Sequence, residues 1–536
     1  MSSYQIKRLD HLGLIAGFCH EIGLVDYINQ QFPNQSSDKP MTYGHCLLAM
    51  ILNGLGFTSQ TLYLQSDYFS DKPTEKLLGK GIKPEHINDA VLGRSLDKFY
   101  EFGVSKLYMG LAEKVVEHLG LDISCHHLDS TSFHVDGDYK NASEDDNCIQ
   151  LVKGYSRDHR PELNQAILNL LVENQAGIPL YMKPASGNSN DKEGFNTIIK
   201  EHLNSFKSAQ NNPYFIMDAA GYTQDNLVYF HQQNRYLISR VPQNIKEAKE
   251  LLQTVDVEQM TELTKGYKGQ WHDSNYADVP QQWLLIYSEQ AYKREKITFD
   301  KQMLKQSELT RKLFKKLTAQ PFACETDARA QLDKWQKQQK FQQVTNVNIK
   351  AIGHYNKKGK PAKDKPFDFY QYYVEGNLYS VLEKRQAILK TKGLFIIATN
   401  DVRKQLGMNE FLTLYKSQQN VEHGFRFLKN PEFLTSSFYL KKPERIEALL
   451  MMMTCCLMVY AGLEHKIRTG LKEKNLQFKN QKKKDYQSPT ARWVFFCFKG
   501  IDILTVDEQQ PIVVNIQERH RIIIEALGSP YKNVYS

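Results

Sequence analysis

The sequence predicts an α/β protein: a mixed sheet flanked by helices, interrupted by a large insertion and preceded by a helical N-terminal domain. Three observations support this prediction. From residue 124 onward, β-branched and aromatic runs alternate with segments of helical periodicity. The first 118 residues instead place apolar side chains at helical spacing, as in Y-G-H-C-L-L-A-M-I-L. A stretch rich in lysine and glutamine separates the early strands from the last one.

Apolar runs and their stop signals define the expected elements. We expect strands at 124–135, 165–174, 178–184, 213–218, 235–240 and 393–400, and helices at 191–206, 223–232 and 244–253. The expected domains are a helical domain at 1–118, a sheet domain in two parts at 119–254 and 391–465, an insertion at 255–390 that is helical and then β, and a basic C-terminal region at 466–536. Residues 81–100 fit either a helix-turn-helix or an ordinary helical hairpin.

Two aspartates stand at positions where such a sheet holds ligands. Asp129 lies in the run I-S-C-H-H-L-D-S-T-S-F-H-V, and Asp218 ends the apolar run P-Y-F-I-M-D. An aspartate at the carboxyl end of a buried strand faces the crevice in which open α/β sheets bind ligands. Taken alone, each is at least as typical of a turn or a helix cap.

A third carboxylate changes that weighting. Glu422 lies in Y-K-S-Q-Q-N-V-E-H-G-F-R-F-L-K, for which we predict a helix over 415–429. At about 100° per residue, Tyr415, Gln418, Glu422 and Lys429 fall on one face of that helix. Together with the two aspartates, this face indicates a metal site made of three carboxylates, whose hard oxygen ligands favour Mg²⁺ or Mn²⁺.

These residues resemble the DDE transposases of bacterial insertion sequences, in the group with the signature Tyr-x2-Arg-x3-Glu-x6-Lys. Tyr415, Glu422 and Lys429 stand at that spacing, whereas Gln418 occupies the arginine position and replaces a charged phosphate contact by a neutral one. The segment G-Y-S-R-D-H-R-P-E-L-N-Q at 154–165 is also similar to the stretch between the first two strands of that catalytic domain. The resemblance covers 124–461 and, more loosely, the whole chain.

The resemblance implies an RNase H-like catalytic domain that cuts DNA at the terminal inverted repeats of an element and transfers the freed strand. Asp129, Asp218 and Glu422 are then the catalytic, metal-binding acids. Two ions per active site would be bridged by Asp129, with the other two acids each completing one side. We therefore expect the three carboxylates to converge to within about 4–8 Å.

The implied partner is double-stranded DNA, both as transposon end and as target, bound by a homodimer. The residues expected to contact DNA are Tyr415, Gln418, Arg426, Lys429, Arg157 and Arg160. The resemblance also implies that the insertion helps to hold the end DNA.

Composition agrees with such a protein. The chain has 69 Lys and Arg against 60 Asp and Glu, a net charge of +9, which is compatible with a polyanionic partner. Basic residues cluster in Lys293–Lys316, which holds nine Lys or Arg, and in His465–Lys484, which holds eight. The eight cysteines show no paired spacing, which disfavours disulfides and a zinc ribbon and fits a reducing cytoplasm, on the nucleoid. The apolar run 448–462 is short for a membrane span of about 20 residues, so we expect a core helix and no membrane partner.

Alternatives stay open at this stage. Asp136, Asp138 and Asp158 are rival acids in turn or loop contexts, and histidines 126, 127 and 134 suggest a zinc hydrolase but lack a fourth ligand at suitable spacing. Two other functions are a catalytically inactive or domesticated DNA-binding protein, and an RNase H-like nuclease without strand transfer.

Overall fold

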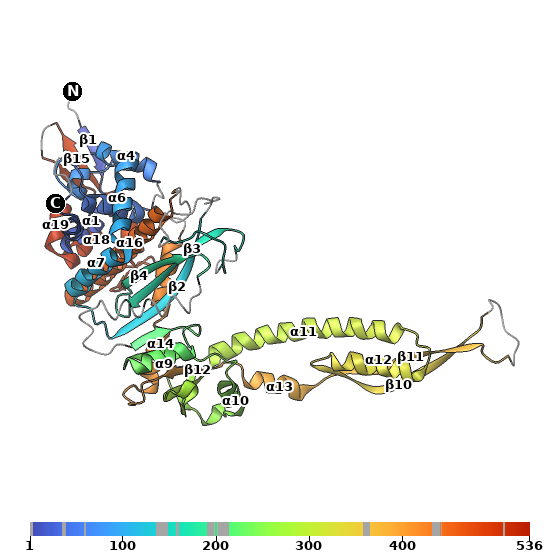
Figure 1. The fold of residues 1–536 in the computed structure, drawn as a ribbon. Coiled ribbons are helices and arrows are strands. Elements are labelled where there is room, and N and C mark those ends of the chain that lie inside the picture. Colours follow the sequence, from blue (N-terminus) through green and yellow to red (C-terminus); the bar gives the residue numbers. More distant parts are fainter. Residues whose placement is uncertain are drawn as a thin grey trace.

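The computed structural model describes residues 4–34, 39–57, 61–135, 148–156, 160–189, 198, 201, 214–356, 365–430, 440, 442–507 and 510–536. Figure 1 shows a body that contains both chain ends and a long arm that projects from it. The body holds a nine-stranded sheet with helices on both faces. The mixed sheet flanked by helices that the sequence predicts is therefore confirmed.

The sheet places its strands in the order β4-β3-β2-β5-β6-β12-β9-β8-β7. Their bounds are β2 Cys125–Val135, β3 Asn164–Glu173, β4 Pro179–Ser186, β5 Tyr214–Met217, β6 Tyr236–Arg240, β7 Thr261–Glu262, β8 Tyr267–Ser274, β9 Gln281–Ser288 and β12 Leu394–Thr399. β2, β3 and β4 form an antiparallel meander, β2, β5 and β6 are parallel, and β12 is antiparallel to both β6 and β9. The parallel strands β2, β5 and β6 thus lie in the interior of the sheet.

Alternating side chains give the sheet two buried faces. Leu128, Met217 and Leu237 point to one face, where they pack against α9 (Gln224–Gln232) and α10 (Lys246–Thr254). The opposite face carries Ile216 and Ile238, which pack against α14 (Met408–Lys416). Next to α14, α15 (Gln419–Leu428) packs on β2 over that same face.

The two ends of the chain share one hydrophobic core with the sheet. Its N-terminal elements are β1 Tyr4–Arg8, α1 Leu12–Glu21, α2 Leu24–Gln31, α3 Tyr43–Leu55, α4 Gln65–Ser70, α5 Thr74–Leu78, α6 Asp89–Phe102 and α7 Val104–Leu119. Its C-terminal elements are α16 Pro443–Glu473, β13 Phe478–Lys479, β14 Asp485–Tyr486, α17 Ala491–Cys497, β15 Asp502–Val506, β16 Ile512–Val514, α18 Glu518–Leu527 and α19 Ser529–Val534. α16 packs against α1, α3, α6 and α7, and β1 pairs with β15. The sequence suggested two separate regions at 1–118 and 466–536, but in the structure the two pack into one core.

Neither the helix-turn-helix nor the helical hairpin expected at residues 81–100 is present. A single 3₁₀ turn, Pro84–His86, stands where the first helix would be. α6 follows it and packs against α16, with the Asp97 carboxylate accepting from Arg445 Nε at 2.7 Å.

The insertion begins later than the sequence suggested. Residues 261–288 form β7, β8 and β9, which extend the main sheet beyond β12. The arm itself consists of α11 Glu289–Ala319, α12 Glu325–Lys337, β10 Gln342–His354, β11 Phe369–Ser380 and α13 Leu382–Lys390. β10 and β11 pair as an antiparallel ribbon, and its inner side packs on α11 and α12 around a small core of its own. β9 leads into the arm and β12 leads out, so the arm starts and ends on neighbouring strands.

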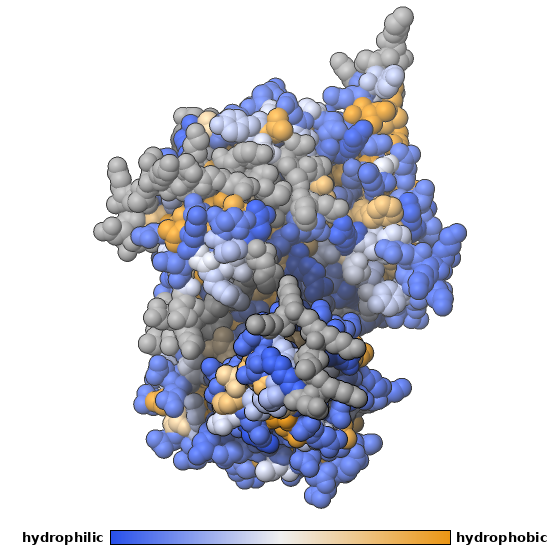
Figure 2. All heavy atoms as spheres, turned by 90° about the vertical axis from the view of Figure 1, so that its right-hand side faces the viewer, coloured by the Kyte–Doolittle hydropathy of each residue, from blue (hydrophilic) through white to orange (hydrophobic). Residues whose placement is uncertain are grey.

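Among the described helices, only α16 is long and apolar enough to cross a membrane. Its most apolar window is 94% buried inside the protein, which is typical of a core helix. Figure 2, which views the molecule from the side on which the arm projects, shows a mainly hydrophilic surface with scattered hydrophobic patches.

Candidate active site

Asp129 and Asp218 are neighbours across the parallel centre of the sheet. β2 and β5 pair in register from Cys125 with Tyr214 to Leu128 with Met217. The next step of that register places Asp129 opposite Asp218, on strands about 4.8 Å apart. Residues at equivalent positions of parallel strands point to the same face. Both carboxylates therefore belong to the face that α14 and α15 cover.

Arg240 joins them from the next strand. β5 pairs with β6 up to Met217 with Ser239, so one further step sets Asp218 beside Arg240 on the same face. The Ser239 hydroxyl donates to the Asp218 carbonyl oxygen at 2.7 Å and ties the two strand ends together. Arg240 is exposed, and its guanidinium lies 5.2 Å from the centre of the Phe395 ring. The Arg240 cation therefore lies next to Asp218.

The phenol of Tyr415 is influenced by Asp218 and Arg240 and also by the third acid, Glu422. Burial raises the pKa of the Tyr415 phenol, the Arg240 cation lowers it, and the Asp218 and Glu422 carboxylates raise it further. Tyr415 is half-buried at the end of α14, and Asp218, Arg240 and Glu422 all act on its phenol.

The helix predicted over 415–429 is in fact two helices, which is a correction. α14 ends at Lys416 and α15 begins at Gln419, with Gln418 as its N-cap residue. The Ser417 hydroxyl bonds to the Leu414 carbonyl at 2.5 Å and lies 3.2 Å from Nε2 of His127 on β2. A side chain that competes for helix carbonyls favours a break in the helix.

Both ends of α15 are fixed on β2. At its start Ser417 contacts His127, and at its end Lys429 Nζ lies 6.0 Å from the centre of the Phe133 ring. α15 therefore runs in the same direction as β2. Glu422 lies about 7.5 Å along the helix from Ser417. Asp129 lies about 6.6 Å along the strand from His127, which brings the two acids level with each other.

His127 is the buried link between the acid-bearing strand and the acid-bearing helix. Its Nε2 is 2.9 Å from Asn174 Oδ1 as well as 3.2 Å from the Ser417 hydroxyl. Burial lowers its pKa to about 4, although the hydrogen bond to Asn174 raises it, so the ring is neutral near neutral pH. A neutral ring adds no charge beside Asp129, two residues further along β2.

The expected convergence of the three carboxylates to within about 4–8 Å stays a prediction. In the part of the chain that the structure describes, no three Asp, Glu, His or Cys side chains are grouped closely enough to hold a metal ion. Each aspartate bonds instead to nearby backbone, since Asp129 Oδ1 accepts from Ser130 N at 2.7 Å and Asp218 Oδ1 accepts from Ala220 N at 2.9 Å. Glu422 is exposed.

The donor chemistry nevertheless fits a hard divalent ion. Asp129 and Asp218 sit on adjacent strands, Glu422 lies level with the first of them, and all three offer carboxylate oxygens. Mg²⁺ and Mn²⁺ prefer such oxygen ligands, whereas zinc sites usually include sulfur or imidazole nitrogen. The neutral, buried His127 bonds to Asn174 and Ser417.

The expected DNA-contacting residues fall into two places. Gln418, Glu422, Arg426 and Lys429 form a stripe beside the buried side of α15, on which Glu422 and Arg426 are exposed. Arg160 is on the loop before β3, where its guanidinium pairs with Glu162 and its backbone N–H donates to Ser156 at 2.9 Å. Ser156 in turn contacts His134, at the far end of β2 from His127. Arg157 and the rival acids Asp136, Asp138 and Asp158 lie outside the described residues.

Comparison with protein families decides what this geometry belongs to. The family model "Transposase DDE domain" matches residues 122–459, well over half of the chain and every element of the site above. The chain belongs to the DDE transposases. A second model, "Domain of unknown function (DUF4277)", matches residues 4–113.

This transposase matches no curated protein. Among solved structures it is similar to the one titled "Cryo-EM structure of piggyBac transposase synaptic complex with hairpin DNA (SNHP)". That similarity covers 93% of this chain and 83% of the other, at 8% identity and a TM-score of 0.38.

Family membership confirms the resemblance to DDE transposases and makes the protein a DDE enzyme, built on a mixed sheet with helices on both faces. Sequence reasoning missed Arg240. The signal was present, because Y-L-I-S-R at 236–240 is an apolar run that ends in a charged residue, as P-Y-F-I-M-D does at Asp218. It also missed His127 as the anchor of the α14–α15 break.

Proposed function

We propose that this transposase is encoded by a bacterial insertion sequence, binds the terminal inverted repeats of its element, and catalyses strand cleavage followed by strand transfer. The observation that carries the proposal is the parallel register that puts Asp129 beside Asp218, with Glu422 level with Asp129 on the covering helix. Two carboxylates on rigid strands and one on a docked helix form a site suited to a phosphodiester.

Asp129, Asp218 and Glu422 are the proposed ligands of Mg²⁺ or Mn²⁺, two ions per active site. Bound ions of this kind activate the attacking oxygen and neutralise charge on the leaving oxygen of an in-line displacement. The residues of the chain position the DNA. Arg240, beside Asp218, is placed to contact the scissile phosphate, and Tyr415 shields that contact from water on one side. Water attacks first to nick the end, and the freed 3′-hydroxyl then attacks the other strand or the target.

Gln418, Arg426 and Lys429 are proposed to contact the flanking phosphates from the stripe on α15, together with Arg160 from the loop before β3 and with Arg157. Gln418 contributes a neutral hydrogen bond at a position where the family signature has a charge. Lys429 lies close to the sheet, with its Nζ 6.0 Å from the centre of the Phe133 ring.

The arm supports a role in holding end DNA. Residues 289–392 contain 23 Lys or Arg and 11 Asp or Glu, a net charge of +12, so that the rest of the chain sums to −3. The outer side of α11 carries most of its cations within an arc of about 140°. These exposed residues are Arg294, Lys301, Lys305, Arg311, Lys312, Lys315 and Lys316. None of the seven forms an ion pair with the described part of the chain. A helix of 31 residues is about 46 Å long and can follow a duplex over more than one turn.

We further propose that the working species is a homodimer assembled on DNA, acting in the cytoplasm on the nucleoid. Two element ends must be processed together, and one chain supplies one set of acids. An arm that projects from the body allows an end held by one subunit to reach the catalytic sheet of the other. The basic stretch His465–Lys484 offers a second surface for the same purpose.

A plasmid assay tests the proposal. The plasmid carries the DNA that flanks the gene on both sides, including any inverted repeats. We expect Mg²⁺-dependent nicking at the repeat ends and joined products. Nicking without joining supports the nuclease alternative, and binding without nicking supports an inactive or domesticated DNA-binding protein.

A further inference from the structure

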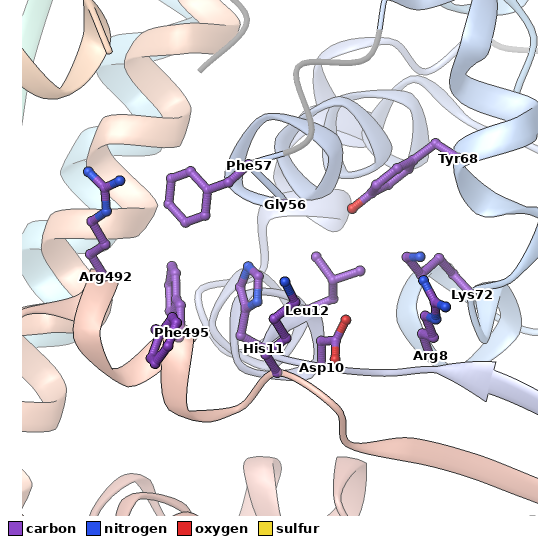
Figure 3. A pocket seen from close by; sticks show the side chains of 12 residues that line it. Arg8, Asp10, His11, Leu12, Gly56, Phe57, Tyr68, Lys72, Arg492 and Phe495 are labelled. Atoms are coloured by element: carbon purple, nitrogen blue, oxygen red, sulfur yellow. The ribbon is translucent and has the colours of Figure 1, made fainter. Parts of the chain in front are cut away.

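A cavity of about 440 Å³ lies far from the catalytic sheet, between α17 and the N-terminal segments around α1, α3 and α4. Figure 3 shows charged and aromatic side chains that converge on it from both parts of the chain. Every lining residue lies outside 122–459, the range that matches the DDE family. The catalytic reaction therefore does not account for it.

Cations dominate the polar part of the lining. Arg8, Lys72, Arg492 and Lys499 contribute four positive charges, and Asp10 is the one acid of the described lining. Asp71, just outside, holds Lys72 Nζ at 2.5 Å and an Arg8 nitrogen at 3.6 Å. Lys499 and Arg492 come from α17 and the turn that follows it, and both are exposed. The α17 side of the cavity is thus the more positive.

Aromatic rings form the rest of the wall. The His11 ring stacks on Phe495 with centroids 4.6 Å apart and on Phe57 at 5.9 Å. Burial lowers the pKa of His11, although the hydrogen bond of its Nε2 with the Leu55 carbonyl at 2.9 Å raises it, so the ring is a neutral stacking partner. Phe496, at the mouth, is 66% exposed and stacks on Trp493. Exposed aromatic rings of this kind accept a flat partner.

The Asp10 carboxylate adds selectivity for a base over a bare anion. Asp10 Oδ1 accepts the Gly500 N–H at 2.6 Å, which fixes the carboxylate at the floor of the cavity. Carboxylates accept hydrogen bonds from base amino and imino groups, as they do from cytosine N4. A bare anion would leave both the Asp10 carboxylate and the aromatic wall unused.

We propose that this cavity is a nucleotide-binding site, in which the base lies against the aromatic wall with its edge toward Asp10 and the phosphate lies toward Arg492 and Lys499. The volume is within the range of about 300–1,000 Å³ of small-molecule sites. Stacking on aromatic rings beside a basic surface is also the way proteins hold unpaired nucleotides of a DNA strand. The source of the nucleotide is therefore either a free nucleotide or an unpaired nucleotide of DNA. The site goes beyond the proposed catalytic function and does not depend on it.

Calorimetry with the full-length protein tests the chemistry. The probes are the four deoxynucleoside 5′-monophosphates, the matching nucleosides and inorganic phosphate. We expect at least one monophosphate to bind about 5- to 150-fold more tightly than its nucleoside and than phosphate alone. Inorganic phosphate that binds as tightly as the monophosphates would overturn the assignment of a base site. Failure of every monophosphate and of a single-stranded oligonucleotide to bind would overturn the proposal altogether.

Two variants test the phosphate end and the base end of the ligand separately, and a further variant serves as the control. Lys499→Ala is expected to weaken all monophosphates alike and to reduce the preference for monophosphate over nucleoside. Asp10→Asn is expected to change the ranking of the four bases while that preference for phosphate remains, an outcome that a purely structural role of Asp10 would not produce. The matched control Lys246→Ala with Lys249→Ala removes two exposed cations from α10 and is expected to change nothing. Equal loss in the control would contradict a site at the cavity.

Competition between a single-stranded oligonucleotide and a monophosphate identifies the source of the nucleotide. A single-stranded oligonucleotide that competes with the monophosphate, and loses affinity in Phe496→Ala and Lys499→Ala, identifies an unpaired strand as the ligand. A monophosphate that binds while the oligonucleotide does not compete identifies a free nucleotide. Thermal unfolding of each variant without ligand checks the fold, which Phe496→Ala is expected to preserve because that side chain is mostly exposed.

Discussion

Asp129 and Asp218 lie side by side on adjacent parallel strands, one residue beyond the last register pair, Leu128 with Met217. Their relative position is fixed by backbone hydrogen bonds of the sheet and does not depend on side-chain rotamers. Glu422 depends on the docking of α15, which Ser417 and Lys429 fix at His127 and Phe133. The proposed site thus joins a rigid pair of acids to a third acid on a separately docked helix.

Arg240→Ala is expected to slow strand cleavage by about 10- to 150-fold, because one charge-assisted hydrogen bond contributes roughly 1.5–3 kcal/mol. Arg240 is exposed at a strand end, so the free energy of unfolding should change little. Single-turnover cleavage measures the rate. Arg240→Lys keeps the charge and should recover part of it, and a wild-type rate for Arg240→Ala would remove Arg240 from the mechanism.

Gln418→Arg restores the charge that the family signature has at this position. Affinity for end DNA should stay the same or increase, and the slope of log K against log salt should steepen by up to about 0.9, the value of one phosphate contact. Fluorescence anisotropy over a salt series measures both quantities. If affinity and slope are both unchanged, Gln418 does not face DNA.

The buried histidines 126 and 127 should make the fold sensitive to acid. Burial lowers the pKa of each to about 4, from the ordinary value of 6.5. As the pH falls, the unfolded chain takes up these protons first. The stabilisation is therefore complete above about pH 6.5 and is lost as the pH falls toward 4, by up to about 3 kcal/mol per histidine.

Urea unfolding at several pH values tests this predicted loss of stability in acid for His127. His127→Asn removes a titrating group, so the free energy of unfolding of the variant should fall less between about pH 6.5 and pH 4 than that of the wild type. Other groups titrate in this range, and the difference between the two proteins isolates His127. Parallel pH profiles would show that His127 is not buried in its neutral form.

Lys312→Ala with Lys315→Ala tests the outer side of α11. Loss of two phosphate contacts should reduce the salt slope of DNA binding by up to about 1.8 and weaken binding at low salt. Lys246→Ala with Lys249→Ala, on α10, removes the same charge elsewhere and serves as the control. An equal effect of both double variants would mean that net charge, and not the arm, governs binding.

Local pattern was sufficient to predict most of the sheet. The apolar runs that end at Asp218 and at Asn400 correspond to β5 and β12, and their polar ends mark where the strands stop. The pairing of Asp129 with Asp218 could only be inferred from the fold class, since register is a long-range property. The break at Ser417 was missed because it depends on His127, which lies 290 residues away in the sequence.

The other differences also come from long-range contacts. The strands at 267–274 and 281–288 mix polar with apolar residues, and their place in the main sheet follows from the pairing of β9 with β12 and of β8 with β9. The common core of the two chain ends depends on contacts such as that of Tyr531 with Glu21, 510 residues apart. Periodicity identifies helices and strands but does not identify their partners.

The most direct test of the account compares the wild type with Asp129→Asn, Asp218→Asn and Glu422→Gln in Mg²⁺-dependent cleavage and joining of end-containing DNA. Each variant keeps the shape of the side chain and removes one carboxylate charge. We predict that each loses roughly a thousandfold or more in rate while binding DNA and unfolding like the wild type, and that Glu410→Gln, an exposed acid on α14, retains full activity. Cleavage at the wild-type rate by any one of the three variants would contradict the assignment of these three acids as the active site.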